Sequence, residues 1–349
     1  MQTIVFTGGG SAGHVVPNIA LIEELLSKTE NNLHYIGTDG IEKRLITPWQ
    51  IPFHTLTCPK LIRGGGLRGF KNNIQIPWAF YRAVKQAKHI LQQIKPDVVF
   101  SKGGYVSLPV VMAAKRLHIP CYAHESDYSV GLANKLSAKY CKKVFTSFPE
   151  TAKKIKHGTY SGSLIRRSIL TSTKAEARKK LHVGFHDKVV LIFGGGSGSE
   201  KINATVRKHI KTLCEKYVVI HACGKGNVID SNIQNYHQTE FIEDMATAYA
   251  CADVIVARAG SGTVFEILAK KKPSILIPLE GQTRGDQMEN ARYFAQKGLC
   301  YTLFERRLNT LPQAIEKVLL DKELLARLQE SGFTSGNATV LRALQGERR

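Results

Sequence analysis

Two glycine-rich turns, one in each half of the chain, place the strongest constraint on how this sequence can fold. The first follows the apolar run 4–6 and reads TGGGSAGH over residues 7–14, and the second follows the run 189–193 and reads GGGSGS over residues 194–199. Glycine permits a tight turn and close approach of backbone N–H groups to a ligand, and a helix N-terminus favours negative charge. A strand, a glycine loop and a helix in each half predict two Rossmann-like domains that face one cleft. Either loop alone is equally compatible with a turn that binds nothing.

Apolar, β-prone runs alternate with helix-patterned stretches along the whole chain. The predicted strands are 4–7, 33–37, 97–101, 121–124, 189–193, 217–222, 254–257 and 274–278. The predicted helices are 14–27, 77–94, 108–117, 201–216, 244–251 and 263–271. This alternation predicts an α/β protein with doubly wound parallel sheets. The polar, strand-poor region 153–173 predicts the boundary between the two domains.

Length and cysteine usage favour a two-domain protein of the cytoplasm. The 349 residues exceed one typical domain, and a hydrophobic content of 43% is enough for a sizeable core. The N-terminus is predicted to be a strand and not a signal peptide, and no apolar run is long enough to span a bilayer. The seven cysteines are scattered, with no C-x-x-C pair. They predict reduced thiols, and neither a disulfide framework nor a zinc site.

The formal net charge of +21 is the unusual feature of the composition. Such an excess indicates an anionic partner: nucleic acid, a membrane surface or a phosphorylated substrate. A basic proteome or plain solubility is the alternative explanation. The sequence has no zinc finger, RNP motif or heptad array, so no nucleic acid partner is expected.

The first glycine turn matches the glycine spacing of the dinucleotide fingerprint but does not match a P-loop. Gly8-x-Gly10-x-x-Gly13 matches the dinucleotide fingerprint, for which an acidic residue should end the second strand. Asp39 is the available acid, although it lies late and is also suited to capping the next helix. A P-loop is excluded because no Gly-Lys-Ser/Thr follows the glycines. A nicotinamide oxidoreductase therefore stays as a distant alternative.

A third strand–loop–helix turn, ARAGSGTVFE over residues 257–266, carries more information. Glu266 is expected in the first turn of the helix, where its carboxylate can accept hydrogen bonds from both ribose hydroxyls while the loop N–H groups meet phosphate oxygens. A glutamate that complements the helix dipole is the alternative. The loop 280–290 after the next strand offers polar groups that could contact a sugar, or it is a solvated surface turn.

The chain resembles the MurG family of glycosyltransferases over nearly its whole length, and the matching segments occur in the same order. The matching segments are GGGSAGHVVP (8–17), SKGGYVSLPVVMAAK (101–115), HESDYSVGLANK (124–135), the turn GGGSGSEKIN, ARAGSGTVFEI (257–267) and RGDQMENA (284–291). The resemblance implies the GT-B fold and an inverting, peripheral membrane enzyme. It implies transfer of N-acetylglucosamine from UDP-GlcNAc to the 4-hydroxyl of a lipid-linked muramyl-pentapeptide, at the cytoplasmic face of the membrane. It also implies an N-terminal domain of 1–163, to which a helix near 333–349 crosses back, and a UDP-sugar domain of 164–332.

The resemblance also assigns donor-site residues. Ser11, Ala12 and Gly13 would face the sugar and the acceptor diphosphate, and Asp127 stands where many members have a sugar-contacting asparagine. Arg166 would meet the UDP diphosphate, and Gly196, with Ser197 beside it, stands where a serine is usual. The backbone of Ile242 would contact uracil. The turn formed by Ser261, Gly262, Thr263, Val264, Phe265 and Glu266 would hold diphosphate and ribose, and Gln287 the sugar, with Asn290 one turn beyond. Ala12, Asp127 and Gly196 depart from the family pattern.

The chemistry requires a hydroxyl to attack the anomeric carbon while UDP leaves. No Asp-x-Asp occurs, so neither a metal nor another cofactor is expected; Arg166 and helix N-termini would stabilise the leaving diphosphate. His14 is the candidate base, because a helix N-terminus should lower its pKa and keep the imidazole neutral. Alternatively, His14 hydrogen-bonds a phosphate or orders the loop. The acceptor side is expected at Gly10, Gly103, Gly104, Tyr105, His124 and Glu125, of which the last two are rival bases.

A glycine-rich loop with apolar and basic residues, 59–71, and the segment 76–82 predict contact with an anionic membrane. Lys85 and Lys88 extend the basic character. For Trp78 and Phe80 taken singly, packing in the core is the favoured interpretation. Two other functions stay open: a GT-B enzyme that uses a UDP-sugar on another acceptor, and a UDP-sugar-binding protein without activity.

Overall fold

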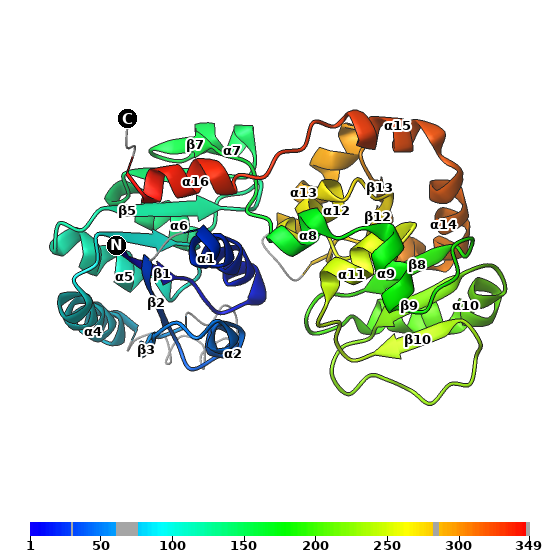
Figure 1. The fold of residues 1–349 in the computed structure, drawn as a ribbon, viewed down its shortest axis with the longest axis horizontal. Coiled ribbons are helices and arrows are strands. Elements are labelled where there is room, and N and C mark those ends of the chain that lie inside the picture. Colours follow the sequence, from blue (N-terminus) through cyan, green and yellow to red (C-terminus); the bar gives the residue numbers. More distant parts are fainter. Residues whose placement is uncertain (29–30, 61–75, 282–285, 347–349) are drawn as a thin grey trace. The chain divides into compact units, whose positions relative to one another are not determined.

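The computed structural model describes residues 1–28, 31–60, 76–281 and 286–346 (Figure 1). Contacts between Cα atoms divide the chain into two compact units. Unit 1 consists of Met1–Arg166 and Ser335–Arg349, and unit 2 consists of Arg167–Thr334. Each unit contains one parallel sheet with helices packed on it.

The sheet of unit 1 has seven strands in the order β3-β2-β1-β4-β5-β6-β7, and all of their pairings are parallel. The order reverses at β1, which lies between β2 and β4. The strands are β1 (Gln2–Thr7), β2 (Asn31–Gly37), β3 (Phe53–Thr55), β4 (Val98–Ser101), β5 (Cys121–Glu125), β6 (Lys143–Thr146) and β7 (Gly158–Tyr160).

Helices cover both faces of this sheet because its strands are apolar on both sides. Val5 of β1 packs with α4 (Ile76–Ile94) and α5 (Ser107–Arg116). Its neighbours Ile4 and Phe6 pack with α1 (Val16–Lys28) and α16 (Asn337–Leu344) on the opposite face. The helical elements of unit 1 are η1 (Ala12–His14), α1 (Val16–Lys28), α2 (Ile41–Ile46), η2 (Thr47–Trp49), α4 (Ile76–Ile94), α5 (Ser107–Arg116), α6 (Leu132–Ser137), η3 (Ala138–Tyr140), α7 (Pro149–Lys154) and α16 (Asn337–Leu344).

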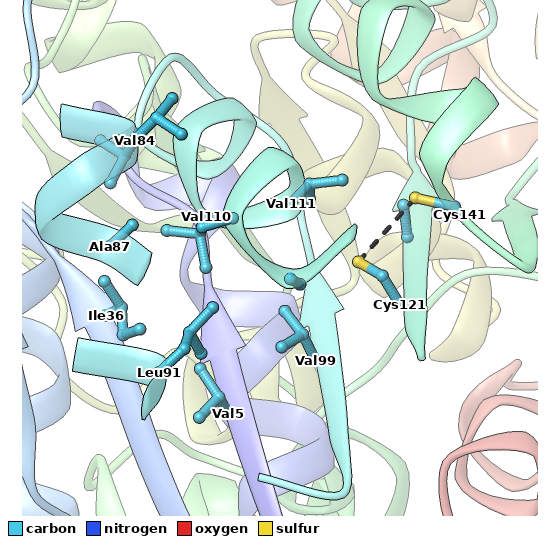
Figure 2. Packing of buried hydrophobic residues seen from close by; sticks show 14 of the residues in the cluster. Val5, Ile36, Val84, Ala87, Leu91, Val99, Val110, Val111, Cys121 and Cys141 are labelled. Carbon is cyan, nitrogen blue, oxygen red and sulfur yellow. Dashed lines mark hydrogen bonds between the residues drawn. The ribbon is translucent and has the colours of Figure 1, made fainter. Parts of the chain in front are cut away.

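Figure 2 shows the core between the sheet of unit 1 and the helices α4 and α5. Val5 and Val99, from adjacent strands, lie beneath Leu91 of α4 and Val110 of α5. The Sγ atoms of Cys121 and Cys141 are 4.0 Å apart at the side of this cluster. All seven cysteines are free, and six of them are buried.

The sheet of unit 2 has six parallel strands in the order β10-β9-β8-β11-β12-β13, with its reversal at β8. The strands are β8 (Val189–Phe193), β9 (Val218–Ala222), β10 (Tyr236–Thr239), β11 (Val254–Ala257), β12 (Ser274–Leu276) and β13 (Tyr301–Thr302). The helical elements are α8 (Arg167–Thr171), α9 (Lys174–Lys180), α10 (Glu200–Lys216), α11 (Met245–Cys251), α12 (Ser261–Ala269), α13 (Asp286–Gln296), η4 (Glu305–Thr310), α14 (Leu311–Leu320) and α15 (Lys322–Glu330).

The prediction of an α/β protein with parallel sheets is confirmed, and each of the eight predicted strands is present. The helix predicted to begin at residue 14 begins at Val16, after the separate 3-10 turn η1. The region 153–173, predicted to be poor in strands, contains the edge strand β7. Asp244 is the N-cap of α11, where its carboxylate accepts a hydrogen bond from the Thr247 N–H at 3.0 Å.

Candidate functional site

In unit 1, the loops that follow β1 and β4 meet at the point where the strand order reverses. A Cβ atom at Gly104 would clash with the carbonyl oxygen of Gly9 and would lie 3.2 Å from His14 Nδ1. A Cβ at Gly10 would lie 2.7 Å from the ring of Tyr105. The structure therefore brings the predicted residues Gly10, His14, Gly104 and Tyr105 together. Open α/β sheets bind ligands in the crevice at this position.

His14 is the last residue of the turn η1 and is partly exposed. Its Nδ1 lies 3.0 Å from Ser11 Oγ, so the serine hydroxyl and the imidazole share a hydrogen bond. When Nδ1 carries the ring proton and donates it to Ser11 Oγ, Nε2 is the nitrogen that can accept a proton. The hydrogen bond thus orients the imidazole beside a loop that also contains Ala12 and Gly13.

Glu42 binds the first glycine loop through its carboxylate, and no pattern in the sequence predicted this role. Its fully buried carboxylate accepts hydrogen bonds from Gly10 N at 3.3 Å, from Thr38 N at 2.9 Å and from the Thr38 hydroxyl. Asp39, the acid considered for a dinucleotide site, is exposed and pairs with Lys43 at 2.8 Å. No motif marks Glu42, because its link to the glycine loop is a single bond from the backbone N–H of Gly10, about thirty residues away in the chain.

His124 and Glu125, at the end of β5, are buried. Burial and the nearby Lys102 charge lower the pKa of His124 to about 3, and His124 Nε2 donates to the carbonyl oxygen of Gly162 at 3.1 Å. The Glu125 carboxylate accepts from Asp127 N at 3.1 Å and from Gly131 N at 2.8 Å. These side chains therefore hold the loop that presents the half-exposed Asp127.

Lys102 is a second buried residue whose role the sequence did not indicate, although it lies within the matching segment 101–115. It follows β4 directly, and its N–H donates to the carbonyl oxygen of Thr7 at 2.8 Å. Burial lowers the pKa of its ammonium group, while the charges of Glu125 and Asp127 act in the opposite direction. The side chain of Lys102 thus interacts with the residues at the end of β5, while its backbone leads directly into Gly103, Gly104 and Tyr105.

The glycine loop after β8 in unit 2 contains two kinds of glycine. Cβ atoms at Gly194 and Gly198 would collide with Ser199 and with the carbonyl oxygen of Cys223, so these two positions shape the turn. Cβ atoms at Gly195 and Gly196 would meet no atom of the described residues within 4 Å. Their backbone is consequently open to a ligand, and the exposed Ser197 lies beside them.

The helix α12 begins at the next strand end along the sheet, after β11. Its N-cap is Gly260, which has no side chain to cap the helix. A Cβ atom at Gly260 or Gly262 would meet no atom of the described residues within 4 Å. Val264 and Phe265 are buried, and the Val264 N–H donates to the carbonyl oxygen of Gly260 at 3.0 Å, whereas Ser261 and Thr263 lie in the first turn. A helix N-terminus of this kind favours an anion.

Glu266 lies in the second turn of α12 and not in the first, because the helix already begins at Ser261. The prediction of a first-turn position was therefore wrong. The helix starts earlier than expected because Gly260 has extended backbone angles, φ −65° and ψ 137°, and serves as the N-cap. The side chain of Glu266 is partly exposed, as contact with a ligand requires.

Gln287 and Asn290 both attach α13 to neighbouring strand ends. Gln287 Oε1 accepts from Leu279 N at 3.1 Å, and the fully buried Asn290 donates from Nδ2 to the carbonyl oxygen of Ala259 at 3.2 Å. The partly exposed Ile242 lies between β10 and α11, and Arg166 is the last residue of unit 1 before the chain enters unit 2. Residues 282–285, which include Arg284 of the motif RGDQMENA, lie outside the described residues.

The first turns of α4 carry an exposed aromatic and basic surface, formed by Trp78, Tyr81, Arg82 and Lys85 and called the α4 stripe below. The rings of Trp78 and Tyr81 stack at 5.7 Å, and the Arg82 guanidinium lies 5.4 Å from the Trp78 ring. Trp78 is 61% exposed, so the prediction that it packs in the core was wrong, whereas Phe80 does pack against the core of unit 1. Residues 61–71 of the predicted membrane loop lie outside the described residues.

In the described part of the chain, no helix is both long enough and apolar enough to cross a membrane. The same residues contain no group of three or more His, Cys, Asp or Glu side chains placed to hold a metal ion.

Comparison with known proteins gives matches over both units. Residues 4–146 match the glycosyltransferase family 28 N-terminal domain, and residues 189–340 match the glycosyltransferase family 28 C-terminal domain. One relative is the UDP-N-acetylglucosamine–N-acetylmuramyl-(pentapeptide) pyrophosphoryl-undecaprenol N-acetylglucosamine transferase of Clostridium perfringens strain SM101. The two sequences are 42% identical over 314 residues, and the alignment covers 88% of this chain and 87% of that protein. The transferase of the same name from Clostridium novyi is 40% identical over 330 residues, 92% of this chain and 91% of that protein.

Solved structures show the same architecture. The crystal structure of Acinetobacter baumannii MurG superposes with a TM-score of 0.74 at 25% identity, over 98% of this chain and 99% of that chain. The glycotransferase of kitacinnamycin superposes with a TM-score of 0.71 at 17% identity, over 99% and 96% of the two chains, and is evidence for the fold alone.

Proposed function

Because this chain belongs to glycosyltransferase family 28, we infer that it transfers N-acetylglucosamine from UDP-GlcNAc to the muramyl sugar of undecaprenyl-diphospho-muramoylpentapeptide. The single observation that carries this conclusion is 42% identity, over 88% of the chain, to transferases named for that reaction. The fold is GT-B, with one parallel α/β sheet in each unit. The reaction is a step of peptidoglycan synthesis.

We propose that unit 2 binds the nucleotide sugar at the carboxyl ends of β8 and β11. The open backbone at Gly195 and Gly196 and the N-terminus of α12 supply N–H groups to the diphosphate. Glu266, partly exposed in the second turn, accepts hydrogen bonds from the ribose hydroxyls. Ile242 contacts the uracil through its backbone, and Gln287 contacts the sugar. Asn290 supports this site from inside, because its amide group is bound to Ala259.

We propose that His14 is the general base of the reaction. The acceptor hydroxyl attacks the anomeric carbon, the bond to the UDP oxygen breaks, and the hydroxyl proton passes to His14 Nε2. The hydrogen bond between Ser11 and His14 Nδ1 orients the ring for that transfer. Arg166 and the α12 N-terminus stabilise the charge that develops on the leaving diphosphate. The loops at Gly10 and at Gly103–Tyr105 form the acceptor side, together with His124 and Glu125, whose side chains hold the adjoining loop that presents Asp127.

We propose that unit 1 lies against the anionic cytoplasmic face of the membrane, where the lipid-linked acceptor is held. The α4 stripe supports this placement because stacked, exposed aromatic rings next to cations suit the headgroup boundary. The net charge of +21 adds a long-range attraction to an anionic surface.

Thermal unfolding with UDP-GlcNAc, UDP-glucose, ADP-glucose and NAD in parallel tests the donor assignment. UDP-GlcNAc at 100-fold its dissociation constant should stabilise the protein by about 2.7 kcal/mol. Glu266→Ala should abolish this stabilisation, whereas Glu316→Ala, on an exposed helix of the same unit, should keep it. Turnover with the lipid acceptor then separates an enzyme from an inactive binding protein. A response to NAD without any response to UDP compounds would contradict the transferase assignment.

A further inference from the structure

Arg258 is a buried cation directly behind the proposed diphosphate site of unit 2. It follows the last residue of β11 and precedes the N-cap of α12 by two positions. Its side chain is only 11% exposed. The backbone at this position is therefore part of the nucleotide loop, whereas the guanidinium group lies inside the unit.

The guanidinium group of Arg258 contacts three other strand-end segments at once. Its Nη1 donates to the carbonyl oxygens of Ile277 at 3.3 Å and Pro278 at 3.4 Å, just after β12. Its Nη2 donates to Ser199 Oγ at 2.8 Å, in the loop after β8. The same Nη2 lies 2.7 Å from Glu305 Oε1, at the start of η4. The planar fork of arginine can span these acceptors, which a single ammonium group cannot.

Glu305 holds Arg258 in this position. Its carboxylate is 5% exposed and also pairs with Lys201 of α10. Burial alone would raise the pKa of Glu305, but Lys201 and Arg258 together lower it and keep the carboxylate ionised. Buried ion pairs add little net stability compared with apolar packing, so stability alone is a weak reason for this cluster.

We propose that Arg258 is a positioning residue for the nucleotide site, which fixes the loops after β8, β11 and β12 in the arrangement that receives the ligand. The proposal rests on the proposed function, because it assumes that these loops bind UDP. Both terminal nitrogens of Arg258 are already bound to protein acceptors, so the guanidinium acts through the loops and not by direct contact with phosphate. A loop displacement of about 1 Å is enough to weaken binding and catalysis strongly.

Glu305→Gln separates positioning from direct charge attraction, because the two roles predict opposite effects. Removing the negative charge of Glu305 raises the net positive charge around Arg258. If Arg258 contacted the diphosphate directly, the variant would therefore bind UDP equally well or more tightly. A positioning role predicts weaker binding, because Arg258 loses its anchor. Arg258→Lys keeps the charge but loses the fork, so positioning again predicts weaker binding. Glu316→Gln is the matched control, because its carboxylate forms an exposed ion pair with Lys216 on the same unit.

Dissociation constants for UDP and uridine should be measured by calorimetry and ligand-observed NMR, with thermal unfolding to verify that each variant is folded. We expect Glu305→Gln and Arg258→Lys to weaken the binding of UDP by about tenfold and that of uridine by less, because the displaced loops are proposed to hold the diphosphate. In turnover, the KM for UDP-GlcNAc should rise by that factor while kcat changes less. Glu316→Gln should match the wild type in every measurement.

Two results would overturn the positioning role: UDP binding in Glu305→Gln that is unchanged or tighter, or an equal loss in Glu316→Gln. In each of these cases the wild type still binds UDP, so the proposed function stands. A folded wild type that does not bind UDP would overturn the proposed function together with the role of Arg258.

Discussion

Single glycines in this protein have two separate roles, and the structure distinguishes them. At Gly104 there is no room for a side chain, because Gly9 and His14 lie against it, and its φ of +82° is in the left-handed region. At Gly196 and Gly260 there is open space and an ordinary negative φ. The first kind makes the crevice of unit 1 possible, and the second kind leaves backbone accessible to the donor.

Gly104→Ala should destabilise unit 1 and lower turnover, because the new methyl group would push the loop after β1 away from the loop after β4. Alanine at a left-handed φ costs about 1–2 kcal/mol, and the clash with Gly9 adds to this loss. Gly226→Ala is the matched control, since Gly226 has a φ of +72° but open space around it. Denaturant unfolding should show a larger loss in Gly104→Ala. Equal losses in the two variants would contradict a packed crevice.

His14→Ala should lower kcat by roughly 10²- to 10⁴-fold, the usual range for removal of a general base. The affinity for UDP should stay near that of the wild type, because His14 lies on unit 1 and the proposed nucleotide site lies on unit 2. Steady-state kinetics with the lipid acceptor and UDP titration measure both quantities. Turnover near the wild-type value would exclude His14 as the base and would leave its rivals His124 and Glu125, at the end of β5.

The residues that the sequence could predict are those at strand ends, because glycine turns after apolar runs reveal where such ends lie. The roles of Glu42, Lys102 and Arg258 could not be predicted in the same way, although Lys102 and Arg258 directly follow β4 and β11. Each is a buried ionisable side chain that interacts with groups in distant segments, and such partners are determined by the tertiary fold. The sequence therefore indicated the surface of the site but not the charges that hold it.

Among the elements, the strands that were predicted are those with fully apolar runs, such as β8 and β11, whose residues are all buried. Parallel strands covered on both faces show this pattern. Five strands of the described residues were missed: β6 and β10, with four residues each, and the shorter β3, β7 and β13. The last three have only two or three residues and lie at sheet edges. Their residues are partly exposed, so hydrophobic periodicity does not reveal them.

The end of β5 should make unit 1 sensitive to acid, because His124 is buried in its neutral form with a pKa of about 3. An unfolded histidine titrates near 6.5. Since the folded pKa is the lower one, this contribution to stability is complete above pH 6.5 and is lost as the pH falls toward 3. At pH 5 the loss attributable to His124 is about 2 kcal/mol.

His124→Gln should remove this contribution to the pH dependence of unfolding. The difference in unfolding free energy between the wild type and the variant should therefore shrink between pH 7.5 and pH 5. His237→Gln, at an exposed histidine, is the control and should keep the wild-type pH profile. Denaturant unfolding at several pH values provides the measurement. A constant difference between wild type and His124→Gln across this range would contradict a buried neutral histidine.

For the whole molecule, the sequence predicted two parallel-sheet units because each half repeats the same succession of strand, glycine loop and helix. The net charge of +21 is also a property of the whole chain, and its effect depends on where apolar groups accompany the cations. The position of Trp78 could not be predicted, because an aromatic residue on an amphipathic helix suits either face near its end. The structure places Trp78 outside, with Tyr81 and Arg82.

Binding to a membrane should then have two separable parts, one from the charge of the whole molecule and one from the α4 stripe. In co-sedimentation with anionic phosphatidylglycerol vesicles, binding should fall steeply as salt rises from about 0.05 M to about 0.5 M, because the electrostatic part is screened. A double variant, Trp78→Ala with Tyr81→Ala, should weaken binding at both salt concentrations, because apolar insertion into the headgroup boundary is lost. Phe185→Ala is the matched control: this ring is 78% exposed but lies on unit 2. Its removal should leave binding unchanged if the α4 stripe is the surface that enters the membrane. Binding that is insensitive to salt would contradict the electrostatic part, and an equal loss in Phe185→Ala would assign the apolar part to a surface other than the α4 stripe.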